Sequence, residues 1–375
     1  MKTGYFIRQS SILAAFSATL FACDPSNEAP QPYERGVLVL NSGNFFDNNG
    51  SISLLTRTSD TASTNIFQRV NNRPLTGGAQ GYAEVEDKGL ILVDNSSAGL
   101  DKVEIVDART FKSLATLAAP DIENPRAVVK VGAGKAYVTC WGTVGQFPNF
   151  FVNPGYIAVV DLTQNRITKK IPLQKGVEGL ALVGNEVFIT GQGDENLLQV
   201  VDSQTDAVRI FMTGAGSATK SGIDLGGNAG TLTLDANNKL WTLVGREAVR
   251  INPQTKTIEA RLPVGTDPRR SPGNLTLSGD RRTLFFTYTF YDAADNYKQK
   301  GELYAFGIND TSIPTTKPVA RKVFSGLGFD AESNLLYAGF TPSFKQAGYV
   351  FRYQSDGKLV DSVKVEVGPS GFYFK

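Results

Sequence analysis

Aromatic rings and amide side chains recur together in the segments that we expect to be loops, a combination suited to ligand binding. The segment 139–155 reads TCWGTVGQFPNFFVNPG and combines one Trp with three Phe. Aromatic faces pack on flat ligands, each contact adding roughly 0.5–1.5 kcal/mol beyond area burial, while amides bond to polar edges. We therefore predict ligand contacts at nine positions: Asn44, Phe45, Trp141, Phe147, Gln192, Arg246, Tyr288, Tyr291 and Phe340.

A structural role for the same rings is the alternative. Long loops often pack their own aromatic side chains into small satellite cores. We expect at least one of the three Phe residues in segment 139–155 to be structural in this way. Binding is therefore favoured for the surface that gathers these loops, and each single ring has both interpretations open.

Catalysis has less support from the composition. The chain has no histidine, which removes the commonest general base and the usual nitrogen ligand of zinc. Its two cysteines are too few for a thiolate metal cage or a disulfide framework. We predict no catalytic residue, no bound metal and no cofactor. The oxygen-rich strings 47–51 and 292–296 are weak calcium candidates that ordinary turn chemistry also explains.

The charge balance argues against nucleic acid as a partner. Lys and Arg number 38 against 36 Asp and Glu, which gives a formal net charge of +2 over 375 residues. No long run of one sign is visible, and a nucleic-acid interface depends on a basic stripe or patch.

The N-terminus has the pattern of a lipoprotein address. Lys2 and Arg8 precede a short apolar run that ends in Leu-Phe-Ala before Cys23, which resembles the lipobox of bacterial lipoproteins. We predict a signal peptide over 1–22, acylation of Cys23, and a Pro-rich tether over 23–35. The alternative is an ordinary secretory signal with a cysteine that happens to follow it. With the anchor, the mature protein belongs to the outer membrane or cell surface, without a membrane span of its own.

Beyond residue 36 the chain repeats one pattern with a period near 50 residues. Short β-rich runs begin at 36, 89, 135, 186, 239, 283 and 334, each followed by a loop and a strand that ends in an Asp or Asn turn. Such periods indicate propeller blades, and four short strands per repeat with Gly, Asn and Asp turns fit one blade. The turn residues Asp107, Asp161, Asp202 and Asn252 are predicted to cap their turns and not to catalyse.

The two ends of the repeat region complement each other. Segment 369–375, PSGFYFK, looks like an innermost strand without its blade, and segment 36–70 looks like a blade without its innermost strand. Pairing them would close the ring and remove exposed strand edges. We predict an all-β, seven-bladed β-propeller over 36–375, with the loops between second and third strands and those between blades on one face. That long-loop face would gather the predicted contacts.

The segment ERGVLVLNSGNFFDNNGSISLL and the repeated VVDxxT pattern, as in VVDSQT, carry a resemblance to a known family. With them the chain resembles the YncE-like propeller lipoproteins of Bacteroidota surfaces. One branch of these is similar in layout to the BtuG lipoproteins, which capture vitamin B12 and pass it to an outer-membrane transporter. The resemblance implies a small planar or polar ligand, such as cobalamin or another corrinoid, and a TonB-dependent transporter as partner. A lactonase-like hydrolase and a protein-binding or adhesion scaffold are the alternatives, because propellers host many functions.

Overall fold

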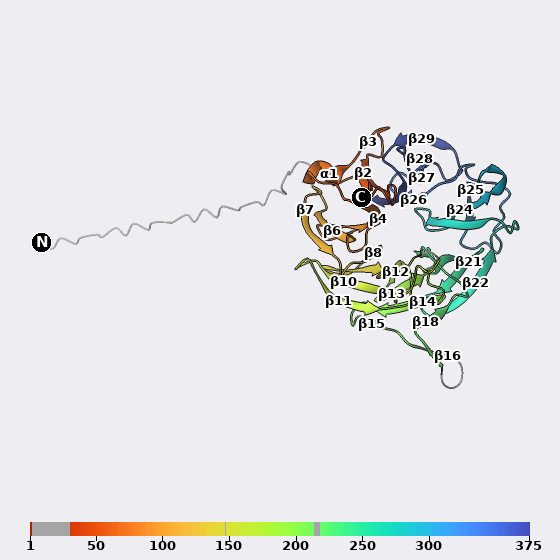
Figure 1. Ribbon diagram of the computed structural model, residues 1–375, viewed down its shortest axis with the longest axis horizontal. Coiled ribbons are helices and arrows are strands. Elements are labelled where there is room, and N and C mark those ends of the chain that lie inside the picture. Colours follow the sequence, from red (N-terminus) through yellow and green to blue (C-terminus); the bar gives the residue numbers. More distant parts are fainter. Residues whose placement is uncertain (2–30, 147, 214–217) are drawn as a thin grey trace. The chain divides into compact units, whose positions relative to one another are not determined.

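The propeller prediction is confirmed by the structure. The computed structural model describes residue 1 and residues 31–146, 148–213 and 218–375 of the chain. The predicted signal peptide and Cys23 lie outside the described residues. Within the compact unit Pro32–Lys375, seven antiparallel sheets surround a central axis (Figure 1).

The C-terminal strand completes the first blade, as predicted. Strand β30 (Pro369–Phe374) is the innermost strand of a sheet in which β1 (Val37–Asn41), β2 (Ser51–Leu55) and β3 (Ala62–Ser63) follow outward. Val39 pairs with Phe372, and the backbone N–H of Lys375 donates to the carbonyl of Gly36 at 2.9 Å. The ring is therefore closed by main-chain hydrogen bonds between the two ends of the propeller.

The other six blades follow in chain order, each from its innermost strand outward. Blade 2 contains β4 (Gly78–Val85), β5 (Lys88–Asp94), β6 (Lys102–Asp107) and β7 (Ser113–Ala118). Blade 3 contains β8 (Pro125–Gly132), β9 (Lys135–Cys140), β10 (Tyr156–Asp161) and β11 (Arg166–Pro172). Blade 4 contains β12 (Val177–Val183), β13 (Glu186–Gly191), β14 (Leu197–Asp202) and β15 (Ala207–Val208), with β18 (Gly222–Asp224) also paired to β14.

Blade 5 contains β19 (Thr233–Leu234), β20 (Leu240–Val244), β21 (Glu247–Asn252) and β22 (Thr257–Pro263). Blade 6 has three strands, β23 (Ser271–Leu277), β24 (Thr283–Asp292) and β25 (Lys298–Gly307). Blade 7 contains β26 (Gly326–Asp330), β27 (Leu335–Phe340), β28 (Tyr349–Tyr353) and β29 (Leu359–Lys364). A separate hairpin, β16 (Phe211–Thr213) with β17 (Ala218–Lys220), precedes blade 5, and the helical elements are α1 (Ile66–Asn71) and a 3-10 turn (Ala293–Asp295).

The second strand of each blade forms the core because both of its faces are covered by neighbouring blades. In β9, for example, Ala136 to Cys140 are all buried, which explains its apolar run KAYVTC. The predicted turn residues act as caps: Asp202 Oδ1 accepts from the backbone N–H groups of Gln204 and Thr205, both at 3.0 Å. Asp107, Asp161 and Asn252 make equivalent bonds.

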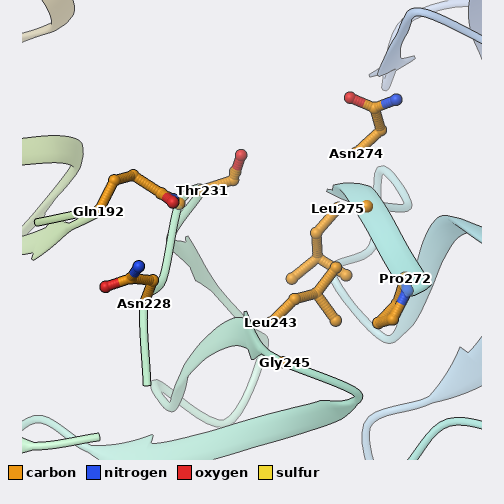
Figure 2. A pocket seen from close by; sticks show the side chains of 10 residues that line it. Gln192, Asn228, Thr231, Leu243, Gly245, Pro272, Asn274 and Leu275 are labelled. Atoms are coloured by element: carbon orange, nitrogen blue, oxygen red, sulfur yellow. The ribbon is translucent and has the colours of Figure 1, made fainter. Parts of the chain in front are cut away.

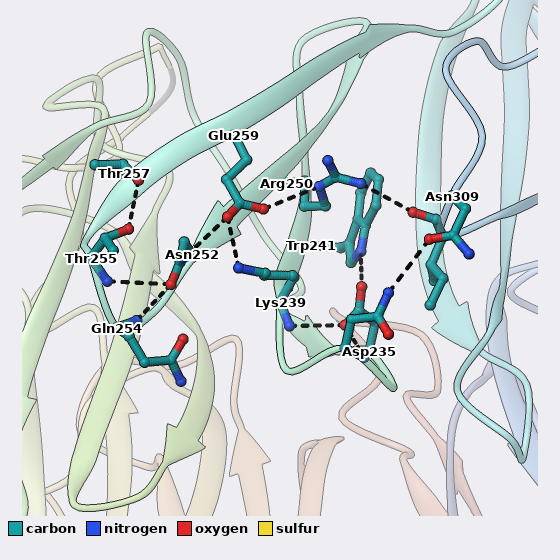
Figure 3. A network of polar contacts seen from close by, with 12 residues as sticks. Asp235, Lys239, Trp241, Arg250, Asn252, Gln254, Thr255, Thr257, Glu259 and Asn309 are labelled. Carbon is teal, nitrogen blue, oxygen red and sulfur yellow. Dashed lines mark hydrogen bonds and ion pairs between the residues drawn. The ribbon is translucent and has the colours of Figure 1, made fainter.

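Blade 5 carries a polar network on the face opposite the long loops (Figure 3). Trp241 Nε1 donates to Asp235 Oδ2 at 2.8 Å, and Lys239 Nζ donates to Glu259 Oε1 at 2.7 Å. Asp235 Oδ1 also accepts from two backbone N–H groups, which completes the pairing of this buried carboxylate. Charges that pair with one another in this way stabilise a blade, and we assign the network a structural role.

No helix in the described part of the chain combines the length and the apolar character that crossing a membrane requires.

Candidate ligand site at the propeller axis

Five innermost strands have a β-bulge at the end that faces the long loops. The register against the second strand shifts between Pro369 and Gly371, Ala79 and Gly81, Pro125 and Val128, Val177 and Leu180, and Gly273 and Thr276. A bulge leaves extra residues unpaired and changes the direction of their side chains. The residues inserted here include Gln80, Arg126, Glu178 and Asn274, and all four line one cavity.

This axial cavity has a volume of about 510 Å³ and lies where the seven innermost strands begin. Every blade contributes at least one polar group to its wall. In blade order from 1 to 7, these polar side chains include Ser370, Gln80, Arg126, Glu178, Thr231, Asn274 and Ser325. The long-loop face is therefore the face on which the cavity opens, since the innermost strands start on the side of the inter-blade loops.

A side pocket of about 290 Å³ extends the axial cavity between blades 4 and 6. It shares Gln192, Thr231 and Asn274 with the axial cavity. Figure 2 shows the polar groups of Gln192, Asn228 and Thr231 on one side and Leu243, Leu275 and Pro272 on the other. A mixed polar and apolar lining of this kind is typical of small-molecule sites.

The second-strand residue that faces the next blade differs between blade 4 and blade 5, at the seam where the side pocket lies. In blades 3 and 4, Thr139 donates to the carbonyl of Glu178 in β12, and Thr190 donates to the carbonyl of Gly230 just before β19. By strand register, the blade 5 counterpart is Leu243, which has no donor. The polar tie from β20 to the next innermost strand is therefore missing, and Leu243 lines the pocket at this seam.

The wall of the axial cavity from blades 2 to 4 is charged, and we call Asp94, Arg126 and Glu178 the charged wall. Arg126 Nη1 lies 3.1 Å from Asp94 Oδ2, and its Nε lies 3.5 Å from Glu178 Oε2. The Arg126 guanidinium also lies over the Trp141 ring, 4.0 Å from its centroid. Trp141 Nε1 donates to Glu178 Oε2 at 3.0 Å, so ring and carboxylate hold the guanidinium in place.

Burial perturbs the acids of this wall. Desolvation raises the pKa of Asp94 to about 6, although the positive charge of Arg126 acts in the opposite direction. Desolvation also raises the pKa of Asp101, which neighbours Asp94 and accepts hydrogen bonds from the backbone N–H groups of Asn95 and Asn124. Asp94 Oδ1 is buried, and the neighbouring carboxyl of Asp101 contributes to the raised pKa of Asp94. Perturbed acids beside a cavity are characteristic of functional sites.

Exposed aromatic and aliphatic side chains occupy the long loops around this face. They come from the ends of second strands and from the loops between second and third strands of blades 1, 2, 3, 6 and 7: Phe45, Phe46, Leu100, Phe150, Val152, Tyr291, Tyr297 and Phe344. Phe46 is 83% exposed and packs against Phe45 with ring centroids 5.4 Å apart. Concentration of exposed apolar groups on one face is a feature of interaction surfaces.

Some of the nine predicted contacts lie at the cavity or on the exposed loops. Gln192 lines both the axial cavity and the side pocket. Trp141 supports the charged wall from behind Arg126. Phe45 is exposed on the loop between β1 and β2, and Tyr291 is exposed near the end of strand β24. Phe147 lies outside the described residues.

Other predicted contacts have structural surroundings. Tyr288 is 1% exposed and belongs to the core, with its Oη donating to the Asp267 carbonyl, so the prediction that its ring faces a ligand is wrong. Asn44 Oδ1 accepts from the Phe46 backbone within its own loop. Arg246 lies in the tight β20–β21 turn, and Phe340 packs edge-on against Phe351.

The expectation of a structural Phe in segment 139–155 is confirmed by Phe151. Its ring stands perpendicular to Trp141, with centroids 5.0 Å apart and an interplanar angle of 88°. It also lies so close to Gly176 that a Cβ there would meet its ring at 2.9 Å.

The axial residues Gln80, Arg126, Glu178 and Asn274 were not predicted from the sequence, although a signal exists. A polar residue often stands directly before a small residue at the start of the innermost strand, as in Gln80-Gly81, Glu178-Gly179 and Ser370-Gly371. Aligning the repeats on their innermost strands, rather than on their second strands, would have placed these polar residues in one ring.

A comparison with known protein families identifies the family of this chain. A family described as "Domain of unknown function (DUF5074)" matches residues 35–375. The chain belongs to the DUF5074 family. No curated protein matches this DUF5074 chain.

Solved structures share the fold of this DUF5074 chain at low identity. A quinonprotein alcohol dehydrogenase-like protein from Bacteroides thetaiotaomicron is 16% identical, with a TM-score of 0.62 over 89% of this chain and 78% of that one. A functionally unknown protein from Desulfotomaculum acetoxidans is 13% identical, with a TM-score of 0.57 over 91% and 98%. Hydrazine synthase from Kuenenia stuttgartiensis is 13% identical, with a TM-score of 0.54 over 78% and 88%. These similarities concern the propeller fold alone.

Proposed function

We propose that this DUF5074 protein is a lipid-anchored binding protein of the cell surface that captures a small molecule in the axial cavity. The observation that carries the proposal is the convergence of polar groups from all seven blades on one cavity. Its volume of about 510 Å³ falls within the roughly 300–1,000 Å³ of small-molecule sites. The role is binding rather than catalysis.

The side pocket favours a ligand that has both polar edges and an apolar part. Gln192, Thr231 and Asn274 supply amide and hydroxyl groups, while Leu243 and Leu275 supply apolar contacts. Amides offer a donor and an acceptor each, so they match hydroxyl- or amide-bearing ligands without requiring charge.

Corrinoids are the first ligand class to test because of the resemblance to vitamin B12-capturing lipoproteins. A corrin ring system is broad, so cobalamin would lie across the mouth of the axial cavity and reach the long loops. The exposed rings of Phe45, Phe46 and Tyr291 there would add aromatic contacts. A TonB-dependent outer-membrane transporter is the partner that this capture role implies.

The entry of the chain into the propeller suits a lipid anchor placed before it. Tyr33 packs on Phe111, with ring centroids 5.5 Å apart, and its backbone N–H donates to the Arg109 carbonyl at 3.1 Å. Both partners belong to the turn between β6 and β7, on the face opposite the cavity mouth. The described chain therefore enters the propeller on the face opposite the cavity mouth.

Titration of the purified protein with cobalamin, followed by absorbance, tests the proposal, with sugars and sugar-acid lactones as comparators. Saturable binding of one of these classes without turnover is the expected result. Absence of binding to these compounds and to every other small molecule tested would favour a scaffold that binds protein through the same face and would overturn small-molecule capture. Fractionation of cells and labelling with a radioactive fatty acid test the anchor separately.

A hydrolase is the second candidate, and the Asp94 carboxyl is the observation that favours it. Its pKa of about 6, raised by desolvation, suits general acid–base chemistry near neutral pH, and Arg126 links it to the cavity. Lactone turnover that Asp94→Asn abolishes would support this candidate over capture.

A further inference from the structure

The charged wall has more negative than positive charge, and this bears on what the axial cavity can hold. Within the described residues, Arg126 is the only Lys or Arg that lines the axial cavity or the side pocket. It faces two carboxylates, Asp94 at 3.1 Å and Glu178 at 3.5 Å. Asp101 lies behind Asp94 and adds a third acid.

Arg126 is not available to an anionic ligand without loss elsewhere. Its Nη1 is bonded to Asp94, and one face of its guanidinium is covered by the Trp141 ring. An anion that drew the guanidinium away would leave Asp94, which is 5% exposed, as a buried carboxylate without its partner. Removing one partner of such a buried pair is strongly unfavourable.

Glu178 retains capacity for a ligand. Within the described residues, its carboxylate contacts both Trp141 and Arg126 through Oε2, and its Oε1 accepts no hydrogen bond. The side chain is 24% exposed and lines the axial cavity. The buried carboxyl of Asp94, which lies beside that of Asp101, adds to the negative potential behind it.

We infer that the charged wall is a subsite for a positively charged nitrogen group, such as a primary ammonium, on the ligand of the axial cavity. This inference rests on the proposed capture function and specifies its ligand. The ammonium would donate to Glu178 Oε1, while Arg126 stays paired with Asp94. The uncharged part of the ligand would contact Gln192, Thr231 and Asn274. Neutral ligands are tolerated, and ligands with a carboxylate at this point are rejected.

The test uses three probes of similar shape that differ in charge: 4-fluorobenzylamine, 4-fluorobenzamide and 4-fluorobenzoate. Binding to the full protein is followed by ¹⁹F NMR line broadening at pH 7 and low salt. We expect the amine to bind about fivefold more tightly than the amide, as one partly exposed ion pair allows, and the acid more weakly still. In Glu178→Gln the amine should lose this advantage, while Glu86→Gln, which removes an exposed carboxylate on the opposite face, should retain it.

Equal broadening by all three probes, a preference for the acid, or no broadening by any probe would overturn the inference. So would an amine preference that survives Glu178→Gln. These results are distinguishable from failure of the capture proposal. Saturable cobalamin binding without any charge preference would remove only the ammonium subsite, and an amine preference without binding of cobalamin, sugars or lactones would remove only those ligand classes.

Discussion

Replacement of Asp94 by Asn should change how the stability of the protein depends on pH. In the native protein, desolvation raises the pKa of Asp94 from 3.8 to about 6. The native state therefore binds this proton more readily than the unfolded state does. The stabilisation that results is fully present below about pH 4 and is lost as the pH rises through about 6.

The magnitude follows from proton linkage. With a native pKa of about 6 and an unfolded value of 3.8, Asp94 adds about 1.3 kcal/mol to the free energy of unfolding between pH 7 and pH 5. Asn at this position does not titrate, so the variant lacks this gain. Wild-type stability minus Asp94→Asn stability should therefore rise by about 1.3 kcal/mol as the pH falls from 7 to 5.

Urea unfolding of both proteins at pH 5, 6 and 7 measures this difference in stability. The comparison requires that the slope of the unfolding free energy against urea concentration is the same in both proteins. Asp60→Asn, at an exposed position, serves as the matched control and should follow the wild type. Parallel pH profiles for wild type and Asp94→Asn, or a wild type that loses stability relative to the variant on acidification, would refute the reasoning about the charged wall.

Three further outcomes follow from the fold. Trp241→Phe removes the only side-chain donor to Asp235 Oδ2 in the described chain, and Asp235 is 1% exposed. The free energy of unfolding, measured in urea titrations, should fall by about 2–4 kcal/mol. A loss below half of that would contradict the structural role of the blade 5 network. Deletion of 369–375 removes β30 and the closure of blade 1, so circular dichroism on heating should show a lower and broader transition, and an unchanged transition would speak against main-chain closure. Cys140 is fully buried, and burial raises the pKa of its thiol to about 12, so a thiol reagent should react with it only after unfolding. Unfolded mature protein should then show one thiol per chain, since the chain has two cysteines and acylation occupies Cys23, whereas two thiols would contradict lipidation.

The fold could be predicted from the sequence because each second strand repeats the same buried run. Segments such as KAYVTC and EVFIT lie between two neighbouring blades, so burial on both faces keeps them apolar and their spacing regular. The closure by β30 could be predicted because a lone strand at one end matched a missing strand at the other. Both features depend on main-chain pairing, which the period of the pattern reveals directly.

The site was harder to predict because it depends on local shifts in strand register. Gln80, Arg126, Glu178 and Asn274 reach the axis from β-bulges, and a bulge changes which face a side chain occupies without changing the apolar pattern around it. Tyr288 shows the converse. The apolar run TLFFTY predicts a strand that ends at Tyr288, but β24 continues to Asp292. The Tyr288 ring therefore lies within the blade and not in the loop.

Binding at the axial cavity is the central claim, and a titration of variants tests it most directly. The ligand that binds the wild type is titrated against Gln192→Ala/Thr231→Ala, which removes two polar groups from the cavity wall, and against Gln254→Ala, an exposed position on the opposite face. Loss of two hydrogen bonds to ligand should weaken binding about tenfold in the double variant, with Gln254→Ala unchanged. Affinity that is the same in all three proteins would place the ligand elsewhere and contradict the account.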